Sequence, residues 1–180
     1  MPATRPSQLQ SFQSFGELSR FLREGVADED SRQLRDSLGS LADRIDEAVQ
    51  LRRSSTDTAE ITQRVCLLAA AAREHQLLLT GLGSAWHALY EFDAYQRAQR
   101  DLMAAIADWQ EKLRGRSAQE RASFDRFEQV AWRTLGEAVL LIDMYEHQSE
   151  PAHDPLPIAP ATRATRWLHQ MRRWWRQVQR

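Results

Sequence analysis

Cysteine and lysine are almost absent from this sequence. Cys66 is the only cysteine among 180 residues, which excludes an internal disulfide and argues against a disulfide-stabilised secreted domain. It lies in the apolar run VCLLAAAA, so we expect its side chain to be buried as a small hydrophobic group. Lys112 is the only lysine among 24 basic residues, a bias that we attribute to a GC-rich bacterial genome.

Helix breakers and long apolar runs are also scarce. The chain has seven Gly and six Pro, and four of the prolines fall between positions 151 and 160. No apolar run approaches the ~20 residues that cross a bilayer, no secretory leader is visible, and no segment alternates like a β-strand. With 42% hydrophobic and 27% charged residues, the composition is globular, and we expect a cytoplasmic protein.

Apolar residues recur at intervals of three and four along most of the chain, which predicts an all-α fold. We expect helices over residues 7–24, 28–53, 57–79, 85–114 and 117–149, joined by short connections. Residues 1–149 therefore form an antiparallel four- or five-helix bundle with long coiled-coil-like hairpins. The polar stretch 93–101 is expected to be less buried than the rest of its helix.

Short polar motifs predict where the helices start and stop. Ser14 with Glu17, or Ser7 with Gln10, could form a capping box for the first helix. The third helix is expected to start at Asp57. The last connection should end in a capping box made by Ser117 and Glu120, and the segment TGLGS at 80–84 should be a tight turn with Ser84 as the cap, or alternatively a kink.

One seam of the second predicted helix is spaced like a coiled coil. Its residues follow one another at intervals of four and three: Leu34, Leu38, Leu41, Ile45 and Ala48. Such a seam packs inside the chain's own bundle, or it pairs with a second copy and makes a homodimer. The spacing alone leaves both open.

The C-terminal end has a chemistry of its own. Residues 150–161 are rich in proline and predict an extended linker, and residues 162–180 predict a basic amphipathic helix. The apolar face of that helix comprises Trp167, Leu168, Met171, Trp174, Trp175 and Val178. The arginines that border this face are Arg166, Arg172, Arg173 and Arg176. The last 18 residues carry a formal charge of +6, whereas the preceding 162, with 18 basic and 25 acidic residues, carry −7.

Three kinds of target suit this terminal helix. A groove on a protein would cover its three tryptophans, and that protein could be a partner, a sister subunit or the acidic bundle of the same chain. An anionic membrane surface would attract its arginines and accept its indoles, which would place the protein at the inner membrane as a peripheral protein. Nucleic acid is the third candidate, although the acidic body would repel it.

Sequence motifs for catalysis or cofactor binding are weak. The segment Gly81 to Ser84 lacks the lysine and glycines of a phosphate-binding loop, and no cofactor is predicted. A metal-using bundle enzyme could draw on Asp143 and His147, four residues apart, together with His75 or His87. His75 falls on an apolar seam, so we expect a buried histidine with hydrogen-bond partners in preference to a ligand.

These patterns favour a non-enzymatic interaction or adaptor protein. In this interpretation the terminal helix docks on a partner protein or subunit, with its tryptophans as anchors. Peripheral membrane attachment, nucleic-acid binding and a metal-dependent bundle enzyme, in that order, are the alternatives. The identity of the partner does not follow from the sequence.

Overall fold

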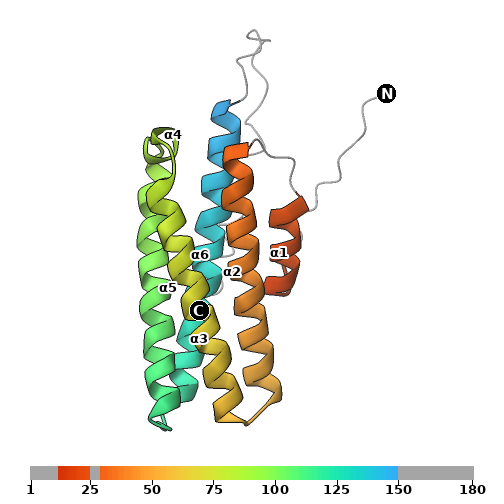
Figure 1. Cartoon of the computed structure of the whole chain (residues 1–180), viewed down its shortest axis with the longest axis vertical. Helices are drawn as coiled ribbons and strands as arrows, with labels where there is room; N and C mark the ends of the chain where they lie inside the picture. The colour runs from red at the N-terminus through yellow and green to blue at the C-terminus, as the bar shows by residue number, and fades with distance from the viewer. Residues whose placement is uncertain (1–11, 25–28, 150–180) are drawn as a thin grey trace, which may run out of the picture. The chain divides into compact units, whose positions relative to one another are not determined.

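The computed structural model describes residues 12–24 and 29–149, and within these residues it contains helices and no strand (Figure 1). The all-α class predicted from the sequence is therefore confirmed for this part of the chain. Six helices are present: α1 (Phe15–Glu24), α2 (Glu29–Ser54), α3 (Thr58–Gly81), α4 (Ser84–His87), α5 (Tyr90–Arg114) and α6 (Glu120–Ser149). None of the described helices has the length and apolarity that crossing a bilayer requires.

The four long helices lie side by side and alternate in direction (Figure 1). Their contacts form a closed ring, because α2 packs on α3, α3 on α5, α5 on α6 and α6 on α2. The short α1 packs on α2, and the ring of its Phe15 stacks on Trp132 of α6 with 4.0 Å between centroids. The short α4 caps the end of the bundle where α3 leads into α5 (Figure 1).

The predicted seam of α2 faces the core of the same chain. All five of its residues, from Leu34 to Ala48, are buried, together with apolar residues of the other long helices. The burial of such side chains stabilises the fold by about 25 cal/mol per Å² of apolar surface removed from water. A homodimer that used this seam would have to open the bundle, so the seam acts inside one chain.

Two predicted helix starts are confirmed in detail. The Oγ atom of Ser14 accepts a hydrogen bond from the backbone N–H of Glu17, so α1 starts near Ser14, later than the predicted Ser7. The Glu17 carboxylate accepts in turn from the N–H of Gln13. The carboxylate of Asp57 accepts from the N–H groups of Ala59 and Glu60 and caps α3 as predicted.

The predicted helix over 85–114 is wrong in two respects. The chain forms the single turn of α4, leaves helical geometry at Leu89 with a ψ of 132°, and starts again as α5 at Tyr90. Ser84 is the first residue of α4 and not its cap, which is Gly83 without any side-chain hydrogen bond. Leu89, the residue at the break, is buried.

The stretch 93–101 is also more buried than its polar composition predicted. Tyr95, Ala98 and Gln99 are fully buried on the inner side of α5, while Asp93, Arg97 and Arg100 are exposed. Gln99 satisfies part of its polarity by donating from Nε2 to the backbone oxygen of Ala72 at 3.2 Å. The Oε1 atom of Gln99 is buried without a hydrogen-bond partner, so the inner side of this stretch belongs to the core and is not the less buried stretch that we expected.

Candidate functional site

The predicted docking helix lies outside the described residues. All ten of its predicted contact residues fall in the segment 162–180, as does the linker 150–161 that precedes it. The structure therefore bears on the docking surfaces of the bundle and not on the tail. The functional features below belong to α2–α6.

His75 is buried, as its position on the seam of α3 predicted, and it is 1% exposed. Both of its ring nitrogens are hydrogen-bonded, Nδ1 to the hydroxyl of Ser37 on α2 at 2.7 Å and Nε2 to the hydroxyl of Tyr95 on α5. Burial lowers the pKa of His75 from 6.5 to about 4, because the charged imidazolium would lose its hydration. Burial likewise raises the pKa of Tyr95. The ring is therefore neutral at pH 7 and joins three helices.

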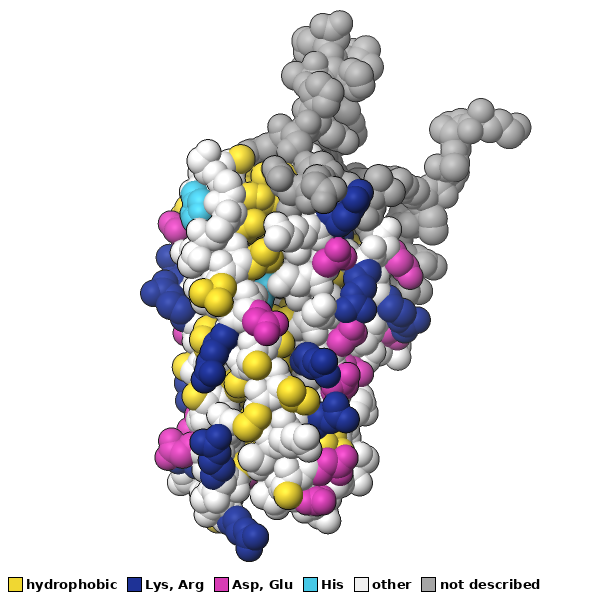
Figure 2. All heavy atoms as spheres, viewed as in Figure 1, with side chains coloured by type: hydrophobic (Ala, Val, Ile, Leu, Met, Phe, Trp, Pro, Cys, Tyr) yellow, Lys and Arg dark blue, Asp and Glu magenta, His cyan; other side chains and the backbone are white. Residues whose placement is uncertain are grey.

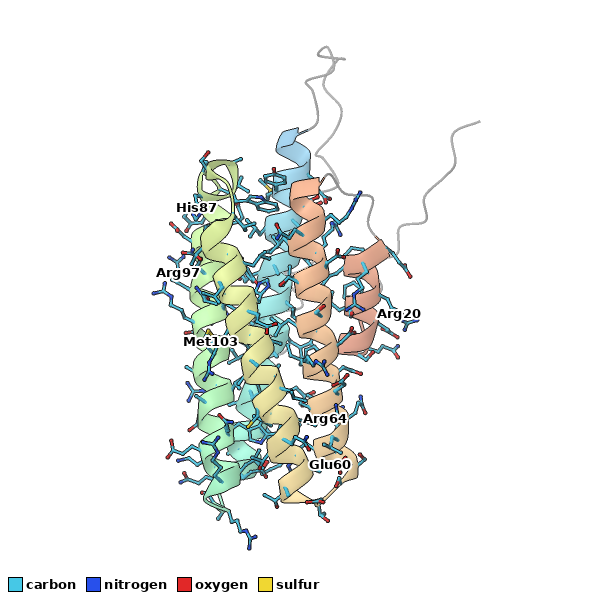
Figure 3. The ribbon with its side chains drawn as sticks, in the orientation of Figure 1. Arg20, Glu60, Arg64, His87, Arg97 and Met103 are labelled. Carbon is cyan, nitrogen blue, oxygen red and sulfur yellow. The ribbon has the colours of Figure 1, made fainter. Side chains whose placement is uncertain are left out.

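The residues considered for a metal site form no ligand group within the part of the chain that the structure describes. His75 uses both ring nitrogens within the core, and His87 is the last residue of the short α4, exposed and edge-on to Phe92 (Figure 3). Asp143 is on α6, and the side chain of His147 is not among those that the structure describes. Within the described residues no three His, Cys, Asp or Glu side chains are grouped as metal ligands.

Cys66 contradicts the prediction that it is buried. Its side chain is exposed on α3, and its sulfur accepts a hydrogen bond from Nε2 of Gln110 on α5 at 2.9 Å. The reason is helical geometry: Val65 and Leu68 point into the core, and Cys66, one residue after Val65, is turned about 100° away from it. An apolar neighbourhood in the sequence does not specify which side of the helix a residue occupies.

The outer face of α3 carries apolar residues, as the inner face does. Leu67 is 43% exposed and Leu77 70% exposed, and between them the chain runs through three alanines that are exposed or half-buried. Figure 2 shows hydrophobic side chains gathered along α3 and its boundary with α5, where Met103 lies (Figure 3). These exposed apolar residues lie among the exposed polar residues Gln63, Arg73 and Glu74, so the outer face of α3 is mixed. The run VCLLAAAA includes both buried residues of the core and these exposed apolar residues, which the sequence alone did not distinguish.

A charged cluster at the opposite end of the bundle from α4 joins α2, α5 and α6. Arg52 of α2 binds the carboxylate of Glu120 with two hydrogen bonds, from Nε at 2.8 Å and from Nη2 at 2.6 Å. The indole N–H of Trp109 donates to the same carboxylate at 2.8 Å. The hydrogen bonds from Arg52 lower the pKa of Glu120, and they raise the pKa of Arg52. The carboxylate is thus a fixed anion that ties three helices together.

Glu120 therefore does not form the predicted capping box with Ser117. The Ser117 hydroxyl oxygen accepts from the N–H of Gln119 at 3.1 Å, while the carboxylate of Glu120 is taken by Arg52 and Trp109. The hairpin between α5 and α6 exists as predicted, but Glu120 of the predicted capping box binds side chains of α2 and α5 instead. The partners of Glu120 are 68 and 11 residues away in sequence, which no local motif reveals.

A pocket of about 390 Å³ opens beside this cluster, between the α2–α3 connection and the α5–α6 connection. Its wall includes Arg52 and Glu120, two further cationic side chains, Lys112 and Arg116, and the apolar side chains of Ile61 and Leu113. The sequence did not predict this pocket, because its residues come from two stretches of chain, 52–61 and 112–120, that only the fold brings together. Comparisons of the whole chain with models of protein families, with curated proteins and with solved structures find no match.

Proposed function

We propose that the protein is a non-enzymatic interaction protein of the bacterial cytoplasm, a helical-bundle adaptor that binds a partner protein. The observation that carries the proposal is the group of exposed apolar side chains on the outer face of α3, which comprises Cys66, Leu67, Ala70 and Leu77. On the other long helices the outward positions are mainly charged or polar. Exposed apolar residues that cluster on one helix are typical of a surface that another macromolecule covers.

The composition of this face suits a protein partner. Leu67 and Leu77 supply large apolar side chains, the alanines between them allow a second helix to approach closely, and Arg73 and Glu74 offer charges of both signs. Tyr90, the first residue of α5, is 78% exposed and is of a residue type enriched at binding hot spots. A mixed face of this kind is less suited to a polyanion such as nucleic acid, which needs a basic stripe.

The terminal segment contributes a second contact in this proposal. The tryptophans of residues 162–180 would anchor on the partner and the arginines would form the charged rim, as the sequence predicts. An adaptor with one rigid apolar face and one tethered helix gains from effective concentration, because binding of either element holds the other nearby.

Reconstituted binding tests the proposal. Partners are first trapped by in-cell crosslinking, then purified, and their affinity for the full chain is measured by calorimetry. We expect Leu67→Glu/Leu77→Glu and Trp174→Ala/Trp175→Ala each to weaken binding by about tenfold or more. Phe21→Glu, which places one glutamate at a 45% exposed apolar residue on α1, is the control for a charge introduced away from α3 and should change little.

Two results would contradict the proposal. One is that no partner binds the purified chain, and the other is that binding is equal in wild type and in both double variants. A tail variant that loses binding to anionic phospholipid vesicles, while the α3 variant keeps every partner, would instead support the alternative of peripheral membrane attachment.

A further inference from the structure

The pocket between the two connections combines positive charge with an apolar floor. Arg52 and Glu120 neutralise each other through their paired hydrogen bonds, so they contribute no net charge to the pocket. The two remaining charged side chains of the wall, Lys112 and Arg116, are both cationic. The side chains that line the pocket therefore have a net charge of about +2, which favours the binding of an anion.

Neither of these two cations is committed to a strong ion pair. The Nζ atom of Lys112 lies 3.8 Å from the carboxylate of Glu111, a side chain that is 78% exposed, and such a pair is worth little. Arg116 makes no ion pair with any residue that the structure describes. By contrast Arg53, at the same end of α2, is bonded to Glu128. Lys112 and Arg116 are thus free to bind an added anion.

Hydroxyl groups complete the polar part of the wall. Thr56 and Thr58 lie on the α2–α3 side and Ser117 on the α5–α6 side. The oxygen of Ser117 already accepts a hydrogen bond, so its proton remains available for donation. Hydroxyl donors next to two cations match the several acceptor oxygens and the charge of a phosphate group.

The backbone at Arg116 belongs to the C-terminal cap of α5. Its φ of 46° is the single positive value at a non-glycine residue in the described chain, and the N–H groups of Arg116 and Ser117 donate to the backbone oxygens of Leu113 and Lys112. The cap accounts for this φ, and it fixes the backbone that carries the Arg116 side chain at the wall of the pocket.

We propose that this pocket binds a small phosphorylated molecule, with the phosphate on Lys112 and Arg116 and the organic part against Ile61 and Leu113. The volume of about 390 Å³ lies in the range of small-ligand pockets and exceeds the need of a lone phosphate. Ile61 and Leu113, which are 3% and 4% exposed, line the pocket and offer the organic part a small apolar contact. This site is separate from the outer face of α3 and does not depend on the proposed adaptor function.

Calorimetric titration of the full chain with inorganic phosphate, glycerol 3-phosphate and adenosine monophosphate tests the site. We expect a phosphate monoester to bind more tightly than inorganic phosphate, and Lys112→Gln and Arg116→Gln each to weaken it by about tenfold. The control is Arg114→Gln, an exposed cation at the end of α5 that does not line the pocket. It removes the same charge from the same end of the molecule.

The single lysine provides a second measurement. Because Lys112 is the only side-chain amine in the chain, an amine-reactive reagent modifies it alone apart from the terminal amine, and mass spectrometry of the peptide containing it gives the rate. The bound monoester should slow this modification. The proposal is wrong if none of the three probes binds at millimolar concentration, or if Arg114→Gln weakens binding as much as Lys112→Gln. It is also wrong if a single-stranded oligonucleotide, titrated as a further probe, binds while the three small phosphates do not.

Discussion

The Nε2 atom of His75 on α3 and the hydroxyl oxygen of Tyr95 on α5 lie 2.5 Å apart in the core of the bundle. With Ser37 of α2 on the other ring nitrogen, the imidazole is bonded on both sides by hydroxyl groups, each of which can donate or accept. A neutral ring satisfies both bonds in either tautomer. A protonated ring would place a charge in the core that no acidic side chain in these hydrogen bonds neutralises, and this predicts how stability depends on pH.

Stability should fall in mild acid because of His75. The unfolded ring takes up a proton near pH 6.5, whereas the folded ring does so only near pH 4. The contribution of the neutral ring is therefore complete above pH 6.5 and is lost as the pH falls towards 4, by about 3 kcal/mol in all. Urea denaturation at a series of pH values should show this loss in wild type.

His75→Gln is the matched variant for that experiment. Glutamine retains hydrogen-bonding groups but does not titrate, so the carboxylates contribute equally to both proteins and the difference between the two curves isolates the histidine. We expect the variant to be less stable at neutral pH and the gap to narrow as the pH falls. Parallel curves over this range would show that His75 does not titrate as its burial predicts.

The sequence predicted His75 and failed at Cys66 for one physical reason. Helical periodicity places a residue relative to its neighbours, and His75 continues the spacing of Leu68, Ala72 and Leu79 on the inner face. Nearly every residue around Cys66 is apolar. The sequence there has no alternation of polar and apolar residues that would distinguish the inner face of the helix from the outer face. The helices themselves could be predicted from the local spacing of apolar residues. The same spacing could not distinguish the exposed apolar residues of α3 from its buried ones.

The pocket and the Glu120 cluster could not be predicted, because they depend on tertiary contacts. Arg52 and Glu120 are 68 residues apart, and only the packing of α2 against α6 brings them together. The break at Leu89 could not be predicted either, because the local sequence favours a continuous helix. Sequence patterns predict elements and their ends, whereas sites built from several elements require the fold.

Removing the charge of Glu120 should destabilise the bundle. Its carboxylate is 15% exposed and accepts hydrogen bonds from Arg52 and Trp109, so Glu120→Gln leaves donors on α2 and α5 without their anionic partner. We expect a loss of about 2 kcal/mol in the free energy of unfolding. Glu128→Gln is the control, because its partner Arg53 is 53% exposed and such a pair contributes less than about 1 kcal/mol. Equal losses in the two variants would mean that burial of the cluster is unimportant.

Cys66 should react with thiol reagents in the folded protein. Its sulfur is exposed and held by one weak hydrogen bond from Gln110, so unfolding is not needed for access. We expect the native rate with Ellman's reagent to lie within about tenfold of the rate in denaturant. A buried comparison is provided by Ala72→Cys in a Cys66→Ser background, since Ala72 is 1% exposed and its replacement should be protected. Strong protection of Cys66 would show that another surface covers the outer face of α3.

The end of α5 predicts a gain of stability from a single glycine. The N–H of Ser117 donates to the oxygen of Lys112 at 3.0 Å and the N–H of Arg116 to that of Leu113 at 3.1 Å, an arrangement that requires the positive φ of Arg116. Gly115, the C-cap residue of α5, has an ordinary φ of −77°. Arg116→Gly should therefore raise the free energy of unfolding by about 1 kcal/mol. Arg116→Ala removes the same charge but keeps the strain, so urea denaturation should show no comparable gain, and equal stabilities of the two variants would refute a backbone origin.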